Sequence, residues 1–236
     1  MNGILYGLGV GPGAPDLLTL RAVRVLQQVD VVLAAASSRN EGSTALDIAR
    51  PHLRPQTRVE RLDFPMTRDP EARARAWDVA AQTAAALLDK GLHAAFVTIG
   101  DPLIYSTFGY LWQTLRARNP AVRVEVVPGI TSFQAAAART HSLLCADGES
   151  LLLLPGIRSR EDMIAALEHA DSAVVLKAYR NLPAIRSALK ACGRAEECVF
   201  ASHVERAEEH IRQGLPAPGD TPPYMSLILS RKARTR

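Results

Sequence analysis

The sequence has few cysteines that could form disulfides or bind structural metals, and it has no long apolar segment that could span a membrane. It contains only three cysteines, Cys145, Cys192 and Cys198, an odd number with no pair at the two-residue spacing of zinc or redox sites. Its uninterrupted apolar runs are far shorter than the roughly 18–20 residues that cross a bilayer. Scattered thiols indicate a reducing, cytoplasmic compartment. We therefore expect no membrane span and no metal ligands.

Aromatic residues and lysine are also scarce. Aromatics make up 5% of the chain, and lysine occurs only at Lys90, Lys177, Lys190 and Lys232. The net charge of +4 and the pI of about 9.2 suit an anionic partner. The basic residues are dispersed, however, and there are few aromatic platforms on which bases could stack, so a nucleic-acid partner is not expected. The bias to arginine favours forked recognition of carboxylate or phosphate, and it also follows from a GC-rich genome.

What the chain does have is a regular alternation of apolar, β-branched runs with segments of helical period. We expect strands at residues 4–10, 31–35, 94–99, 123–127, 150–154, 173–178, 198–202 and 224–230. Helices are expected at 16–28, 43–53, 71–89, 106–118, 132–140, 160–169, 182–191 and 203–212. Apolar strands separated by helices indicate parallel sheets covered on both faces, so the predicted class is α/β. The Asn119-Pro120 pair predicts an N-terminal α/β domain over 1–120 and a C-terminal one over 121–236.

Three glycine-containing segments follow predicted strands. They are residues 7–13 (GLGVGPG), residues 98–107 (TIGDPLIYST) and residues 126–135 (VVPGITSFQA). In open α/β sheets ligands bind beyond the carboxyl ends of the strands, so each is a place for a site. The first does not match the G-x-G-x-x-G fingerprint of dinucleotide sites. Taken singly, the first segment fits a tight turn as well as it fits a site, and the other two favour a turn, a helix cap or close helix packing.

Taken together, in order and spacing, these segments carry a family resemblance. The stretches GVGPGAPDLLTLRAVRVLQQVDVV, GDPLIYSTFGYL and VVPGITSFQAAAAR resemble the tetrapyrrole (precorrin/uroporphyrinogen) methylases of the cobalamin pathway. Within that superfamily, Tyr-Ser-Thr-Phe after residue 102, Ser-Phe-Gln-Ala-Ala-Ala after Gly129 and Phe-Pro-Met-Thr at 64–67 are most similar to the C(20)-methyltransferases of precorrin-2 and cobalt-factor II. The resemblance covers nearly the whole chain. It departs from the pattern at Lys177, where related methylases often have methionine.

The resemblance implies two α/β domains with the active site in the cleft between them. It implies that S-adenosylmethionine, the methyl donor, binds there in a folded conformation, largely through backbone atoms. Carried over residue by residue, the implied cofactor contacts are Gly100, Asp101, Tyr105, Ser106, Thr107, Thr131, Ser132, Lys177, Ala178, Tyr224, Met225 and Ser226. The tetrapyrrole side of the site would be lined by the loop of Gly11, Pro12 and Gly13. The resemblance also suggests a homodimer.

The reaction that the resemblance implies needs few catalytic side chains. Methyl transfer from a sulfonium is a direct displacement, so the protein has to align the reacting atoms. The acceptor carbon of a reduced tetrapyrrole is itself nucleophilic. A base could help the later loss of a proton, and the catalytic residue is left unassigned, with Asp101, His141 and Glu149 as weak candidates.

The acetate and propionate arms of a tetrapyrrole need cations. Five arginines fall on or next to predicted strand-end loops, and we expect two of them to bind carboxylate: Arg21, Arg39, Arg68, Arg139 and Arg158.

The expected activity is thus S-adenosylmethionine-dependent methylation of carbon 20 of precorrin-2 or its cobalt form, in corrin-ring biosynthesis. Two alternatives stay open. One is methylation at another ring carbon or of uroporphyrinogen III. The other is a binding protein that keeps the site but has lost turnover. Because a metal held by the macrocycle needs no protein ligand, the sequence does not choose between the metal-free and cobalt-containing acceptors.

Overall fold

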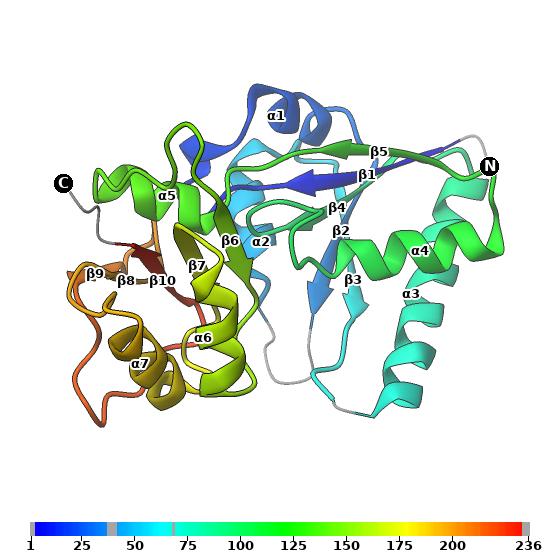
Figure 1. The fold of residues 1–236 in the computed structure, drawn as a ribbon. Coiled ribbons are helices and arrows are strands. Elements are labelled where there is room, and N and C mark those ends of the chain that lie inside the picture. The colour runs from blue at the N-terminus through cyan, green and yellow to red at the C-terminus, as the bar shows by residue number, and fades with distance from the viewer. Residues whose placement is uncertain (1–2, 37–41, 68, 233–236) are drawn as a thin grey trace. The chain divides into compact units, whose positions relative to one another are not determined.

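A computed structural model describes residues 3–36, 42–67 and 69–232 of the chain. The chain divides into two compact units, Met1–Thr131 and Ser132–Arg236. Each unit is built on one five-stranded sheet with helices packed against it (Figure 1). The α/β class is therefore confirmed. In the part of the chain that is described, no helix is long and apolar enough to span a bilayer.

The first unit is built on a fully parallel sheet with the strand order β3-β2-β4-β1-β5. The strands are β1 (Ile4–Gly9), β2 (Val31–Ala36), β3 (Arg58–Asp63), β4 (Ala94–Thr98) and β5 (Arg123–Val127). The helices are η1 (Pro15–Leu17), α1 (Leu20–Leu26), α2 (Thr44–Ala49), η2 (Arg50–His52), α3 (Pro70–Asp89) and α4 (Phe108–Arg118). Helices α1 and α2 pack on one face, and α3 and α4 on the other. Coverage on both faces explains why the central strands are apolar throughout.

The edges of this unit differ from the sequence prediction. Strand β3 was not predicted because its residues are mostly charged, and in the structure it is an edge strand with mostly exposed side chains. The predicted helix 16–28 is split into η1 and α1, because Thr19 begins a new helix and its Oγ1 accepts the Ala22 N–H at 3.1 Å. The division between the units falls after Thr131 and not after residue 120, because β5 pairs with β1 and so belongs to the first sheet.

The second unit has a mixed sheet with the order β6-β7-β10-β8-β9. Its strands are β6 (Leu151–Leu154), β7 (Ser172–Leu176), β8 (Val199–Ser202), β9 (His210–Gln213) and β10 (Ser226–Arg231). Its helices are α5 (Ser132–Arg139), α6 (Arg160–Glu168) and α7 (Leu182–Ala191). Only β6 and β7 pair in parallel, since β10 is antiparallel to both β7 and β8. The expectation of a parallel sheet is therefore wrong for this unit. Helices α6 and α7 share a core cluster with β6, β7, β8 and β10.

The predicted helix over 203–212 is also wrong. His203 and Glu205 have positive φ angles of 48° and 60°, which end any right-handed helix at this point. Residues His210–Gln213 instead form β9, which pairs antiparallel with β8. The residues here are strong helix formers, but pairing with β8 overrides that local propensity.

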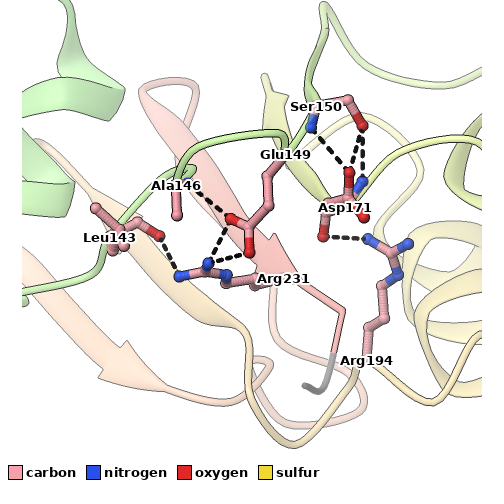
Figure 2. A network of polar contacts seen from close by, with 7 residues as sticks. All are labelled: Leu143, Ala146, Glu149, Ser150, Asp171, Arg194 and Arg231. Carbon is pink, nitrogen blue, oxygen red and sulfur yellow. Dashed lines mark hydrogen bonds and ion pairs between the residues drawn. The ribbon is translucent and has the colours of Figure 1, made fainter. Parts of the chain in front are cut away.

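A polar network fastens the segment after α5 to the sheet of the second unit (Figure 2). Arg231, at the end of β10, pairs with Glu149, whose carboxylate also accepts the Ala146 N–H at 2.7 Å. Asp171 accepts the backbone and hydroxyl hydrogens of Ser150 at 2.8 and 2.9 Å. Arg194 is 3% exposed, and its guanidinium donates to the carbonyls of Asp171, of Leu167 in the last turn of α6, and of Ala170 just after it. Charged side chains thus add to the backbone pairing in this part of the unit, where the Lys232 N–H donates to the Asp171 carbonyl at 2.8 Å.

Candidate functional site

Three backbone segments meet at the carboxyl end of the first sheet, with no room for side chains between them. Gly9, Gly100 and Gly129 follow or end β1, β4 and β5. A Cβ on Gly9 would lie 2.5 Å from the Gly100 carbonyl oxygen and 2.6 Å from the Gly129 nitrogen. The Gly100 N–H also donates to the Gly11 carbonyl at 2.8 Å. The close approach of the loops therefore requires glycine at Gly9 and Gly129.

Asp101 fastens two of these loops together. One carboxylate oxygen accepts the Leu103 N–H at 2.8 Å, and the other accepts the Gly129 N–H at 3.1 Å. Both oxygens are thus engaged by backbone donors, one within its own loop and one from the loop that follows β5. This geometry suits a residue that positions the loops better than one that removes a proton.

The segment after Asp101 presents apolar side chains to solvent. Leu103 and Tyr105 are 59% and 50% exposed, and Tyr105 has a positive φ of 50°. Ser106 is turned inward, because its hydroxyl donates to Thr98 Oγ1 at 3.0 Å and accepts the Phe108 N–H at 3.1 Å. Ser106 therefore closes the start of α4, whereas Thr107, at the N-cap position, makes no capping bond through its side chain. Thr98 lies in the glycine-containing segment 98–107 but was not among the predicted site residues.

Gly100 differs from Gly9 and Gly129, because an added Cβ would be in ordinary van der Waals contact there. A Cβ built there would meet nothing nearer than the Thr131 Cα, at 3.8 Å. Gly100 also has a φ of 71°, which other residues rarely adopt. Thr131 itself is 6% exposed and is the last residue of the first unit, and Ser132 is the first residue of α5.

A second group of predicted residues gathers at the carboxyl end of β7 and the start of β10, which the antiparallel register brings together. Ala178 and Ser226 are buried and bonded to each other, since the Ala178 N–H donates to the Ser226 carbonyl at 3.1 Å. The Ser226 hydroxyl accepts the Tyr179 N–H at 3.1 Å. Tyr224 is 50% exposed, and its ring lies 5.4 Å from that of Tyr179. Met225 accepts the His203 N–H through its carbonyl.

The residues of this second group therefore have two different roles. Ala178 and Ser226 fix the backbone through their hydrogen bond, whereas the side chains of Tyr224 and Lys177 are accessible to a ligand. Lys177 is partly buried and has a positive φ of 53°. Burial, reinforced by the nearby Arg180 guanidinium, lowers the pKa of Lys177.

The predicted substrate-binding residues have different surroundings. Gly11, Pro12 and Gly13 are buried in the loop after β1, and Arg21 is exposed on α1. Arg39 and Arg68 lie outside the described residues.

Arg139 is already engaged by acidic partners. Its guanidinium donates to Glu209 at 2.8 Å and lies 3.9 Å from a carboxylate oxygen of Glu205. Hydrogen bonding to Glu209 raises the pKa of Arg139. This ion pair anchors the end of α5 to the turn between β8 and β9, so the structure gives Arg139 a structural role in place of an open carboxylate site.

The remaining base candidates are also placed in structural roles. His141 is exposed just after α5, with a φ of 51°, where it ends the helix. Glu149 is paired with Arg231. Among the described residues, no cluster of three or more histidine, cysteine, aspartate or glutamate side chains could hold a metal ion.

Known proteins are similar to this chain over nearly its whole length. The family model described as Tetrapyrrole (Corrin/Porphyrin) Methylases matches residues 4–216. The cobalt-precorrin-2 C(20)-methyltransferase of Salmonella typhimurium is 35% identical over 234 residues, 98% of each chain. The precorrin-2 C(20)-methyltransferase of a Sinorhizobium species is 32% identical over 96% of this chain and 94% of its own.

A solved structure shares the fold. The uroporphyrin-III C-methyltransferase of Thermus thermophilus, in complex with S-adenosylhomocysteine, superimposes with a TM-score of 0.66 at 20% identity over 98% of both chains. At that identity the similarity speaks for the fold alone. On the family model and the near full-length relatives, the chain belongs to the tetrapyrrole (corrin/porphyrin) methylases.

Proposed function

We propose that this protein transfers a methyl group from S-adenosylmethionine to carbon 20 of precorrin-2 or of its cobalt-containing form. The observation that carries the proposal is similarity to two relatives named for this reaction, which extends over more than nine-tenths of every chain compared. A similarity of that extent includes both units and all three glycine loops.

The first part of the proposed cofactor site is the loop from Gly100 to Thr107, together with Thr131 at the end of the first unit and Ser132 at the start of the second. The exposed side chains of Leu103 and Tyr105, in the loop that follows the left-handed turn at Gly100, fit a ligand held against this loop. A solved relative of the same fold was obtained with S-adenosylhomocysteine, the product that the donor would leave. When bound, the donor supplies an electrophilic methyl group on a sulfonium centre.

In the second unit we propose that the adenine end is held by Lys177, Ala178, Tyr224, Met225 and Ser226. The bond between Ala178 and Ser226 uses up the Ala178 N–H. Ala178 would therefore contact the donor through its carbonyl and apolar atoms. The Tyr224 ring is the exposed surface on which a flat base could stack.

The protein's contribution to the reaction is alignment and exclusion of water. Displacement at a sulfonium-bound carbon needs no acid to help the leaving group, and the acceptor carbon brings its own electron density. Asp101 has both carboxylate oxygens occupied by N–H donors. We therefore assign Asp101 to holding the cofactor loop in place and leave His141 without a role in proton transfer. The loop of Gly11, Pro12 and Gly13 and the exposed Arg21 remain proposed tetrapyrrole contacts.

The test is anaerobic incubation with S-adenosylmethionine and one of three acceptors: metal-free precorrin-2, its cobalt form, and uroporphyrinogen III. Mass spectrometry is expected to show a single added methyl group on a precorrin-2 acceptor and no product from uroporphyrinogen III. The two precorrin-2 arms also decide between the metal-free and the cobalt-containing substrate. Preferential methylation of uroporphyrinogen III, or no methylation of any acceptor while both ligands bind, would overturn the proposal.

The same proposal includes a cytoplasmic homodimer, which rests on the scattered free cysteines and on the family resemblance. Light scattering of the purified protein measures the mass directly. A mass of 25.5 kDa, that of one chain, would contradict the dimer.

A further inference from the structure

The last residue of β4 carries a hydroxyl whose backbone is held by the parallel sheet. Thr98 pairs in register with Gly9 of β1, and its carbonyl accepts the Val10 N–H at 2.9 Å. Side chains alternate between the two faces of a strand, so Thr98 lies on the same face as Phe96, which shares a core cluster with α3 and α4. The backbone of Thr98 therefore cannot shift without disturbing the central strands.

This hydroxyl meets the far end of the loop that leaves the strand. The Ser106 hydroxyl donates to Thr98 Oγ1 at 3.0 Å, and both residues are partly buried. The two partners are eight positions apart in the chain, and the residues between them belong to the loop proposed to bind the methyl donor. The hydrogen bond therefore closes this loop at its base.

The start of the same loop is fastened by backbone groups. The Gly100 N–H donates to the Gly11 carbonyl at 2.8 Å, and the Asp101 carboxylate accepts two further backbone N–H groups. The bond from Ser106 to Thr98 fastens the opposite end. The loop is thus tied at both ends to the carboxyl end of the first sheet.

The end of the loop is the part that contains strained backbone. Tyr105 has a φ of 50°, which a bulky residue rarely adopts, and such a conformation persists only where the surrounding structure holds it. Its neighbour Ser106 is held twice, because its hydroxyl donates to Thr98 and also accepts the Phe108 N–H at 3.1 Å. Without the acceptor at Thr98, the backbone beside Tyr105 is freer to relax, and the half-exposed Tyr105 ring is freer to move.

Ser106 acts in this arrangement through its place in the loop. A serine hydroxyl has a single hydrogen to donate, and that of Ser106 is directed to Thr98. The same hydrogen is therefore not available to the carboxylate of a bound methyl donor. What the pair controls is the shape of the loop.

We propose that Thr98 is a positioning residue for the methyl-donor site. Its hydroxyl, acting through Ser106, holds Tyr105 and the rest of the loop in the shape that receives S-adenosylmethionine. The inference rests on the proposed function, which assigns the methyl donor to this loop.

The experiment separates the hydroxyl of Thr98 from its methyl group. Thr98→Val keeps the shape of the side chain and removes the acceptor, whereas Thr98→Ser keeps the hydroxyl and removes the methyl group. Thr114→Val is the control, because it removes a hydroxyl that donates to the Tyr110 carbonyl at 2.9 Å within α4, outside the loop. Calorimetry measures the affinity for S-adenosylhomocysteine, initial rates are measured against each substrate, and urea denaturation checks that each variant is folded.

We expect Thr98→Val to weaken S-adenosylhomocysteine binding about fivefold, as for the loss of one neutral hydrogen bond. The loss should appear in the KM for S-adenosylmethionine and not in the KM for the tetrapyrrole. Thr98→Ser restores the acceptor, so its affinity, like that of Thr114→Val, should be within about twofold of the wild type.

A double variant tests whether Thr98 acts through Ser106. If it does, Thr98→Val has nothing left to remove once Ser106 is alanine. The double variant should therefore bind S-adenosylhomocysteine within about twofold of Ser106→Ala alone. A double variant that binds much more weakly than Ser106→Ala would show that Thr98 acts independently, and would overturn the inference.

The remaining outcomes are equally decisive. A wild type that binds S-adenosylhomocysteine, with Thr98→Val binding it equally well, overturns this inference and leaves the proposed function standing. Equal losses in Thr98→Val and Thr98→Ser would assign the effect to packing of the methyl group and also overturn it. A wild type that binds no S-adenosylhomocysteine and methylates no tetrapyrrole removes the proposed function and the inference together.

Discussion

The two units hold their functional loops in different ways. In the first unit, the loops at the ends of β1, β4 and β5 are packed backbone against backbone, and glycine is the residue that permits it. In the second unit, loops are fastened by charged side chains, among them Arg194, the Arg231–Glu149 pair and the Arg139–Glu209 pair. Adding an atom should therefore damage the first unit, whereas removing a charged group should damage the second.

The largest effect is expected in the second unit, at Arg194. Its buried guanidinium satisfies the carbonyls of Leu167 and Ala170 at 2.7 and 2.5 Å. Arg194→Met removes a buried charged donor from both carbonyls, of which that of Leu167 keeps the His169 N–H as a partner. We expect a loss of about 3 kcal/mol in unfolding free energy, measured by urea denaturation. Arg160→Met, at an exposed pair with Glu161, is the control and should cost no more than about 0.5 kcal/mol. Equal losses in the two variants would contradict the account.

Adding one methyl group tests the first unit. Gly129→Ala forces Cβ against the Gly100 carbonyl and the Gly9 backbone, so we expect a loss of about 2 kcal/mol and weaker donor binding. Gly109→Ala is the matched control. Nothing lies within 4 Å of its Cβ position in α4, and alanine should stabilise that helix by about 0.5 kcal/mol. An unchanged unfolding free energy in Gly129→Ala would contradict the close packing of these loops.

The glycine loops are the part of the candidate site that could be predicted from the sequence alone. The loops after β1, β4 and β5 were predicted as sites, because strand, glycine and helix follow one another locally in the chain. The engagement of Arg139 by Glu209 could not be predicted, since the partners are 70 residues apart and meet through a turn that the sequence pattern indicated as helix. Strand β3 was missed for a related reason, because an edge strand with charged side chains lacks the apolar signature of a buried one.

A smaller effect is expected at Asp101, which fastens loops in the first unit by charge. Asp101→Asn keeps one acceptor oxygen and loses the other, so it should cost about 1 kcal/mol in stability and weaken donor binding roughly fivefold. Asp101→Ala should weaken binding further. Calorimetry with S-adenosylhomocysteine measures the affinity. Undiminished affinity with abolished turnover in Asp101→Asn would instead identify Asp101 as a catalytic base.

The smallest effect is expected at Glu209 and depends on pH. Partial burial raises its pKa, but hydrogen bonds from the Glu205 N–H and from Arg139 outweigh burial, and the net pKa is lowered from 4.5. Because the pKa of Glu209 is lower in the folded than in the unfolded state, its ionised carboxylate stabilises the fold at pH values above the unfolded-state pKa. That stabilisation is lost as the pH falls through the folded-state pKa. Glu209→Gln should therefore cost about 0.5–1 kcal/mol at neutral pH. Urea denaturation should show the difference from wild type shrinking below pH 4.5, and a difference that grows in acid would contradict this assignment.

The central claim is that both kinds of loop serve one reaction, methyl transfer to a defined ring carbon. Its most direct test is the position of the new methyl group. S-adenosylmethionine labelled with carbon-13 at the methyl is incubated with the preferred precorrin-2 acceptor, and the product is examined by NMR. The account predicts a single labelled methyl on carbon 20, and a labelled methyl on any other ring carbon would contradict it.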